Sequence, residues 1–466
     1  MQEEEYASLE QAIEQEIGIA HRLGLDFFEM RFELVPARIV YAIGAHGMPV
    51  RFQHWSFGKA YTHMKLGYDL GLSKIYELVI NTDPCYAYLV DSNSLVENMT
   101  VAAHVLGHSD FFKNNAYLSG TSRQMTETME ADAQRFSAYE ARYGRQAVEE
   151  IVDAALALSL HVSPHSDQNI VRWRQAQPAP ALPKTPYDDL FEVPDTRPAV
   201  AHPEGPLHFP SIPEPDLLLF IAENSHVLND WQKDVVNALR AESLYFLPQL
   251  GSKIMNEGWA ALWHARIMRE MDLTEAQTMD FAKLHAAILA PQPGGVNPYL
   301  LGMRLWESIE DRYDHPDRIL QEAGVRSGSG REKIFEVRET ENDVSFLRNY
   351  LTRDLVEELD LYLYQRVGDH WQVVDKDWQA VRDRLVSNRS NNGVPVIEVQ
   401  DGDYNRNGEL YLCHRYEGVS LDRLYAEKTL PYVWRLWGRT VHLQTVQDGK
   451  PVCAMYDGHR CTWKFL

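Results

Sequence analysis

Apolar residues recur at helical spacing along much of the first two thirds of the chain. Residues three and four positions apart lie on one face of an α-helix, so this spacing predicts helices that pack against a common core. Thr274 and Gln277 add a capping box, in which each side chain bonds the other residue's backbone N–H, at the start of one helix. The predicted helices cover residues 4–24, 94–112, 122–143, 146–160, 274–289 and 299–313.

A second pattern, rich in β-branched and aromatic residues, predicts strands. Ile75–Ile80 and Cys85–Val90 flank the turn sequence Asn81-Thr82-Asp83-Pro84, which is typical of a β-hairpin. Residues 31–43 have a similar composition, and further strands are expected at 357–363, 396–400 and 409–414. Helices and strands in separate runs indicate an α+β fold.

Two breaks in the pattern suggest the domain organisation. Twelve of the 23 prolines lie between Pro164 and Pro215, a density that forbids long helices and central strands. Residues 326–330 read Arg-Ser-Gly-Ser-Gly and are expected to form a flexible joint. We therefore expect a mainly helical domain over 1–325, with a small β-hairpin or sheet and a Pro-rich excursion at 161–215. A smaller α+β domain is expected over 331–466.

Composition and charge exclude several classes of function. The 466 residues carry a formal net charge of −22, of which residues 1–330 carry −19. A nucleic-acid-binding surface and attachment to an anionic membrane both need basic surface, so neither is expected. The basic start of a secretory signal and an apolar run long enough for a membrane span are both missing. The four cysteines form no CxxC pair, which favours reduced thiols in a cytoplasmic protein.

The clearest chemical signal is His104-Val-Leu-Gly-His108. Histidines at i and i+4 lie on one helix face, close enough to bind one metal ion. At about 100° per residue, Glu97 falls within about 20° of both histidines, so three candidate ligands share a narrow stripe. The alternative is a pair of buried histidines whose imidazoles hydrogen-bond backbone or carboxylate groups.

A second candidate helix carries Asn256-Glu257-Gly258-Trp259 and continues to Trp263-His264. Glu257 and His264 are seven residues apart and share a stripe among apolar neighbours. Burial of such groups is costly unless they pair or bind metal. The alternative is an internal hydrogen bond from Glu257 to His264 or His104.

Together the two helices suggest one metal site, with His104, His108 and Glu257 as ligands and His264 or Glu97 as a fourth or neighbouring group. Histidine nitrogens with one carboxylate suit zinc with an open position. This arrangement resembles a zincin metallopeptidase, but Val105 stands where zincins have the general-base glutamate. The catalytic carboxylate would then be Glu97, Glu127 or Glu130. A two-metal site rich in carboxylates is a further option.

Several long motifs closely resemble the stage V sporulation protein R family. They are Leu78–Leu89, His104–Asn115, Lys253–Trp259, His54–Lys59 and Asn407–Leu412, and the resemblance extends over nearly the whole chain. The resemblance implies a role linked to the spore cortex, a peptidoglycan layer, or to a stress response associated with a serine protein kinase. It implies no particular reaction.

Two functions are therefore carried forward from the sequence. The first is a metal-dependent hydrolase of peptide or amide bonds, with zinc as the expected divalent metal. The second is a non-catalytic regulatory or scaffold protein whose metal is structural or absent, which the valine at position 105 favours.

Overall fold

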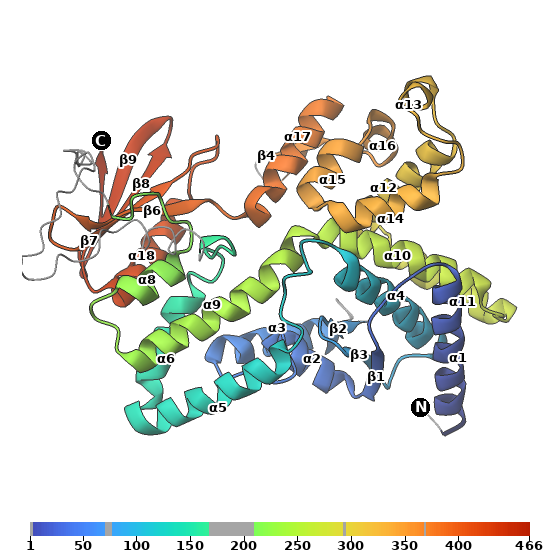
Figure 1. Ribbon diagram of the computed structural model, residues 1–466, viewed down its shortest axis with the longest axis horizontal. Helices are drawn as coiled ribbons and strands as arrows, with labels where there is room; N and C mark the ends of the chain where they lie inside the picture. Colours follow the sequence, from blue (N-terminus) through green and yellow to red (C-terminus); the bar gives the residue numbers. More distant parts are fainter. Residues whose placement is uncertain (1–2, 70–76, 167–208, 292–294, 368–369) are drawn as a thin grey trace, which may run out of the picture. The chain divides into compact units, whose positions relative to one another are not determined.

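The computed structural model describes residues 3–69, 77–166, 209–291, 295–367 and 370–466 (Figure 1). Contacts divide the chain into two compact units. Unit 1 comprises residues 1–142 and 245–394, and unit 2 comprises residues 143–244 and 395–466. Both helices and sheets are present, which confirms the α+β class. Within the described ranges, no helix has the length and apolarity needed to cross a bilayer.

Unit 1 is mainly helical. Its helices are α1 (Glu3–Arg22), α2 (Ala37–His46), α3 (Trp55–Asp69), α4 (Leu95–Asn114), α5 (Met125–Tyr143, whose last residue lies across the boundary), α10 (Lys253–Glu270), α11 (Glu275–Ile288), α12 (Pro298–Asp314), α13 (Arg318–Glu322), α14 (Gly330–Thr340), α15 (Asp343–Tyr350), α16 (Arg353–Glu358) and α17 (Trp378–Arg389). A short 3-10 helix, η2 (Ser390–Gly393), follows α17. Helix α9 (Asp230–Gly251) contains the boundary between the two units.

Two small sheets accompany these helices. In the first, β1 (Met30–Val35) pairs parallel to β3 (Cys85–Val90), and β2 (Leu78–Ile80) pairs antiparallel to β3. The β2–β3 pair is the hairpin that the sequence predicts, although residues 75 and 76 of the expected first strand lie outside the described residues. In the second, β4 (Leu363–Val367) and β5 (His370–Asp375) form an antiparallel pair.

The core of unit 1 forms where α4 and α12 pack on α10 (Figure 1). Trp259 and Trp263 of α10 and Trp306 of α12 are fully buried in it. Glycines permit the close packing: a Cβ on Gly258 would lie 2.2 Å from the carbonyl carbon of Gly302, and one on Gly107 would lie 2.8 Å from Cα of Ala260. Small residues at both crossings therefore bring three helix backbones together.

Unit 2 joins helices to a five-stranded sheet of order β10-β9-β8-β7-β6. The strands are β6 (Ile397–Tyr404), β7 (Glu409–His414), β8 (Val441–Gln447), β9 (Lys450–Tyr456) and β10 (Cys461–Phe465). Helix α18 (Arg423–Trp437) connects the parallel pair β7 and β8. Helices α6 (Arg145–Leu156), α8 (Leu217–Asn224) and the first part of α9 also belong to this unit.

The division by contacts differs from the expected domain limits of 1–325 and 331–466. Residues 331–394 belong to unit 1, because α14 packs on α12 and the N–H of Gly330 bonds the Asp314 carboxylate. The Ser-Gly segment is thus a connection between two helices of one unit. Most of the Pro-rich excursion, residues 167–208, lies outside the described residues.

Two expected strands differ from the structure. Residues 357–363 contain the end of α16 and only the first residue of β4, because Thr352 caps a helix that starts at Arg353. Residues 31–43 divide between β1 and α2, and the backbone changes course at Pro36.

Candidate metal centre

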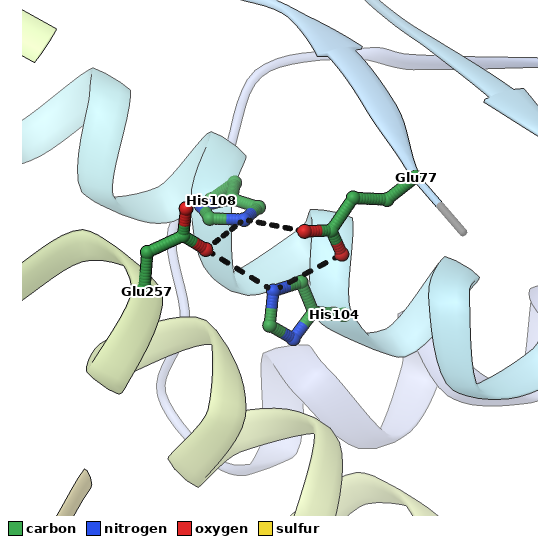
Figure 2. A group of neighbouring side chains, drawn as sticks. All are labelled: Glu77, His104, His108 and Glu257. Carbon is green, nitrogen blue, oxygen red and sulfur yellow. Dashed lines mark ion pairs between the residues drawn. The ribbon is translucent and has the colours of Figure 1, made fainter. Parts of the chain in front are cut away.

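Four side chains of unit 1 meet at one point: Glu77, His104, His108 and Glu257 (Figure 2). One ligand atom from each lies within 4.8 Å of all the others. The Nε2 atom of His104 lies 3.2 Å from Glu77 Oε2 and 3.9 Å from Glu257 Oε2. The Nε2 atom of His108 lies 3.5 Å from Glu257 Oε2 and 4.0 Å from Glu77 Oε1. These residues are referred to below as the His₂Glu₂ cluster.

Helix α4 positions the two histidines. Ser94 and Glu97 form a capping box that starts the helix, and nearly every side chain from Val96 to Phe112 is buried. A helix that is buried on all sides cannot rotate about its axis without losing core contacts. His104 and His108 are therefore held side by side on one face, 2% and 4% exposed.

Helix α10 positions Glu257, and its start is fixed from a distant part of the chain. The Asp343 carboxylate accepts hydrogen bonds from the backbone N–H groups of Ile254 and Met255, at 3.0 Å each. Asp343 is also paired with Arg389 at 2.7 Å. A carboxylate at a helix N-terminus satisfies free N–H groups and complements the helix dipole. This cap lies about one helical turn before Glu257.

Glu77 is the member of the cluster that the sequence analysis missed. It directly precedes β2, where the residue pattern indicated only a strand position. The Tyr299 hydroxyl donates a hydrogen bond to Glu77 Oε1 at 3.1 Å, which leaves Oε2 toward His104. A carboxylate before a buried hairpin was the available signal, but no periodicity connects it to helices α4 and α10.

The cluster perturbs the acidity of its members. Burial raises the pKa of Glu77, but the imidazoles of His104 and His108 outweigh this and lower it to about 2. Burial likewise lowers the pKa of His108, yet the bond to Glu77 and the charge of Glu257 raise it to about 9. Burial and the nearby carboxylates raise the pKa of Tyr299, so its hydroxyl remains a donor.

Two facing atoms of the cluster have unused bonding capacity. His104 Nε2 and Glu257 Oε2 are buried and have no hydrogen-bond partner among the described residues. Such atoms are costly in a folded protein unless a further group satisfies them. Donors that share one ion with bonds near 2 Å lie about 3–4 Å apart, which matches the distances in the cluster. Two imidazoles and two carboxylates therefore suit a divalent ion such as zinc.

Neighbouring groups orient both imidazoles. His108 Nδ1 lies 2.9 Å from the Asn256 side-chain oxygen, and His104 Nδ1 lies 2.8 Å from His264 Nδ1. Metal-binding histidines commonly donate their second N–H in this way. His264 itself uses its other ring nitrogen on His285, at 2.8 Å. The structure thus places His264 behind His104, with both of its ring nitrogens directed at other imidazoles.

The candidate catalytic carboxylates do not join the cluster. The Glu97 carboxylate accepts the N–H of Ser94 at the start of α4, about two helical turns before His104. Glu127 and Glu130 are exposed on α5. Val105 is fully buried in the main hydrophobic core of unit 1. Among the described residues, Glu77 is the carboxylate of the cluster that the sequence did not predict.

Comparisons with known proteins agree with the division of the chain. A family model described as SpoVR like protein matches residues 3–394, and one described as SpoVR-like C-terminal domain matches residues 395–448. The junction at 394/395 is also where unit 1 ends. A relative from Escherichia coli strain K12, the uncharacterized protein YcgB, is 27% identical over 92% of this chain and 90% of its own length. No solved structure matches.

Proposed function

The chain belongs to the SpoVR-like protein family, and on that premise we propose that unit 1 contains a zincin-like metal centre that hydrolyses peptide or amide bonds. The family name ties its members to sporulation, so the proposed substrates are the peptide bonds of cortex peptidoglycan or of a protein needed to build it. The observation that carries the proposal is the His₂Glu₂ cluster, in which two buried facing atoms have no hydrogen-bond partner among the described residues.

The proposed roles follow from the direction of each side chain. His104, His108 and Glu257 are the ligands, since their facing atoms come from two helices fixed by core packing. A divalent ion held there supplies a Lewis acid that polarises a carbonyl group and activates water. Glu77 is the general base in place of the residue at position 105. Its Oε1 is held by Tyr299, and its Oε2 faces the cluster and can accept a proton.

The same cluster supports a second candidate, a non-catalytic protein with a structural metal. Structural zinc sites use four protein donors, whereas catalytic sites keep one position open. If Glu77 is a ligand, the cluster supplies four donors and the centre is closed. The role of Glu77 therefore separates an enzyme from a scaffold.

Two variants distinguish these candidates. Glu257→Gln keeps the shape of the side chain but is a neutral and poorer ligand, so metal per chain should fall sharply. If Glu77 is the base, Glu77→Gln should still bind metal but should no longer hydrolyse the substrate. If Glu77 is a ligand, the variant should bind less metal and melt at a lower temperature. His63→Gln changes an exposed histidine of α3 and is the matched control.

The measurements are elemental analysis of the purified chain, melting curves before and after chelation, and release of amines from cross-linked peptidoglycan peptides. Stoichiometric metal that survives in Glu257→Gln would remove Glu257 from the ligand set and the zincin analogy with it. A wild-type chain that takes up no metal would refute the hydrolase and the structural metal, and would favour a regulatory or scaffold protein without metal.

A further inference from the structure

Three imidazoles form a continuous chain that leads away from the cluster. His104 of α4 contacts His264 of α10 through their Nδ1 atoms at 2.8 Å, and His264 Nε2 lies 2.8 Å from Nδ1 of His285 on α11. His264 is fully buried, whereas His285 is partly exposed. The chain thus runs from the His₂Glu₂ cluster through the core to a residue near the surface.

Hydrogen bonding in this chain has only two consistent directions. A neutral imidazole has one N–H and one bare nitrogen, and each N···N contact needs one of each. In the outward direction, His104 Nδ1–H donates to His264, and His264 Nε2–H donates to His285. In the inward direction both bonds reverse, and the proton of His104 is on Nε2, facing Glu77 Oε2 at 3.2 Å.

The surroundings keep the two outer imidazoles, His264 and His285, neutral. Burial lowers the pKa of His264, and the neighbouring imidazoles and Arg269 act in the same sense. Burial and Arg269 also lower the pKa of His285. The Phe281 ring lies nearly perpendicular to His264 in a T-shaped contact and stacks on His285, so apolar surface adjoins both. His264 and His285 therefore change tautomer rather than charge.

We propose that His264 and His285 are positioning residues that set the tautomer of His104, and that loading a metal in the cluster selects the outward direction of the chain. This inference rests on the proposed metal centre. A cation needs the bare Nε2 of His104, which only the outward direction provides. An N–H at that position would repel a cation, so metal binding and the direction of the chain are linked.

The protons balance across the reversal. His104 loses its Nε2 proton through the cluster to solvent and receives one on Nδ1 from His264. His264 in turn receives one on Nε2 from Nδ1 of His285, and His285 gains a proton from solvent on its own Nε2. Each ring loses one proton and gains one, and the tautomer of a residue outside the ligand set reports the state of the centre.

Substitutions at position 264 test the link. His264→Asn retains an oxygen near the place of Nδ1, so it can still accept the N–H of His104 while its contact with His285 is lost. His264→Leu removes both contacts. Loss of such a partner typically weakens metal binding by about 10- to 100-fold. We expect that loss for His264→Leu with Zn²⁺ or Co²⁺ alone, and recovery to within a few-fold of wild type for His264→Asn.

Nitrogen NMR of ¹⁵N-histidine-labelled full-length chain supplies a readout that a merely structural role would not change. In wild type, addition of Zn²⁺ should move the proton of His285 from Nδ1 to Nε2. In His264→Asn the tautomer of His285 should no longer respond to Zn²⁺, although Zn²⁺ still binds. This readout holds even if His264→Leu fails to fold.

The outcomes separate the relay from the metal centre. A wild-type chain that binds neither Zn²⁺ nor Co²⁺ overturns the centre and the relay together. Tight Zn²⁺ binding by wild type with no change in the His285 tautomer overturns the relay alone. Undiminished metal affinity in a folded His264→Leu variant does the same.

Discussion

Replacing Gly258 with alanine tests how the helix crossings hold the centre. The new Cβ would lie 2.2 Å from the carbonyl carbon of Gly302 and 2.6 Å from the backbone nitrogen of Met303. Both are backbone atoms that cannot rotate away. Ordinary contact begins near 3.4 Å, so α10 and α12 must separate by about 1 Å. Overpacking of this kind costs about 1–3 kcal/mol, and backbone obstacles place the expected loss at the upper end.

The displacement should also weaken metal binding, because Glu257 directly precedes Gly258 in α10. Melting curves of the metal-free chain measure the first effect, with about 2–4 °C lost for each kcal/mol. Titration with Co²⁺ or Zn²⁺ measures the second. Gly18→Ala is the matched control, since it changes another helical glycine with nothing within 4 Å of the new Cβ. It should stabilise α1 by up to about 1 kcal/mol.

A Gly258→Ala chain that melts within error of wild type and binds metal equally well would contradict both expected effects. That result would mean that the α10–α12 crossing relaxes without moving Glu257. A fall in stability with unchanged metal affinity would separate the packing of the core from the position of the ligand.

Three further predictions concern the groups around the cluster. Tyr299→Phe removes the donor to Glu77, so the free energy of unfolding of the metal-free chain, measured with denaturant, should fall by about 1–3 kcal/mol. A fall below about 0.5 kcal/mol, the range of substitutions that remove no buried contact, would contradict this role. Because the pKa of Glu77 is lowered from its ordinary value of 4.5 to about 2, this group stabilises the metal-free chain at pH values above 4.5. This contribution is lost as the pH falls toward 2. Because the pKa of His108 is raised from its ordinary value of 6.5 to about 9, this group stabilises the metal-free chain at pH values below 6.5, and its contribution is lost as the pH rises through 9. The melting temperature should therefore be highest between pH 4.5 and pH 6.5. A melting temperature that does not change with pH would refute the pairing of Glu77 with His108. Asp343→Asn keeps an acceptor but leaves Arg389 without its anion, so unit 1 should lose about 1–3 kcal/mol in the same unfolding assay, whereas an unchanged midpoint would deny it a role in starting α10.

Residues within one helix were the part of the site that the sequence could predict. The spacing of His104 and His108 fixes their shared face once the segment is helical, and Ser94 marks where that helix starts. Glu257 was identified because an acid in a strongly apolar helix needs a partner. These inferences need only the helical repeat and the cost of burial.

Residues that depend on tertiary packing could not be predicted in this way. Glu77 is separated from α4 by the β2–β3 hairpin, and nothing in its local sequence sets the distance to His104. Glu97 shares the stripe of the two histidines, yet its carboxylate caps its own helix because Ser94 is nearer than the cluster. His264 lies two turns after Glu257 on α10, but the crossing of α4 and α10 directs it behind His104.

The expected domain limit near residue 326 differs from the division by contacts, again because of a long-range contact. Flexible residues such as those at 326–330 occur between domains and also between packed helices of one domain. Only the contact of α14 with α12 distinguishes the two cases, and that contact is not encoded in the joint itself.

The cap on α10 has a consequence for how the protein is made. Asp343 and Arg389 complete the start of the helix that carries Glu257, so the centre depends on residues that leave the ribosome long after Glu77 and His104. At about 5–20 residues per second, more than 300 further residues after Glu77 take on the order of 15–60 s to translate. During that interval Glu77, His104 and His108 have been synthesised, but the start of helix α10 is not yet capped. Completion of the His₂Glu₂ cluster is accordingly a late step in the folding of the nascent chain.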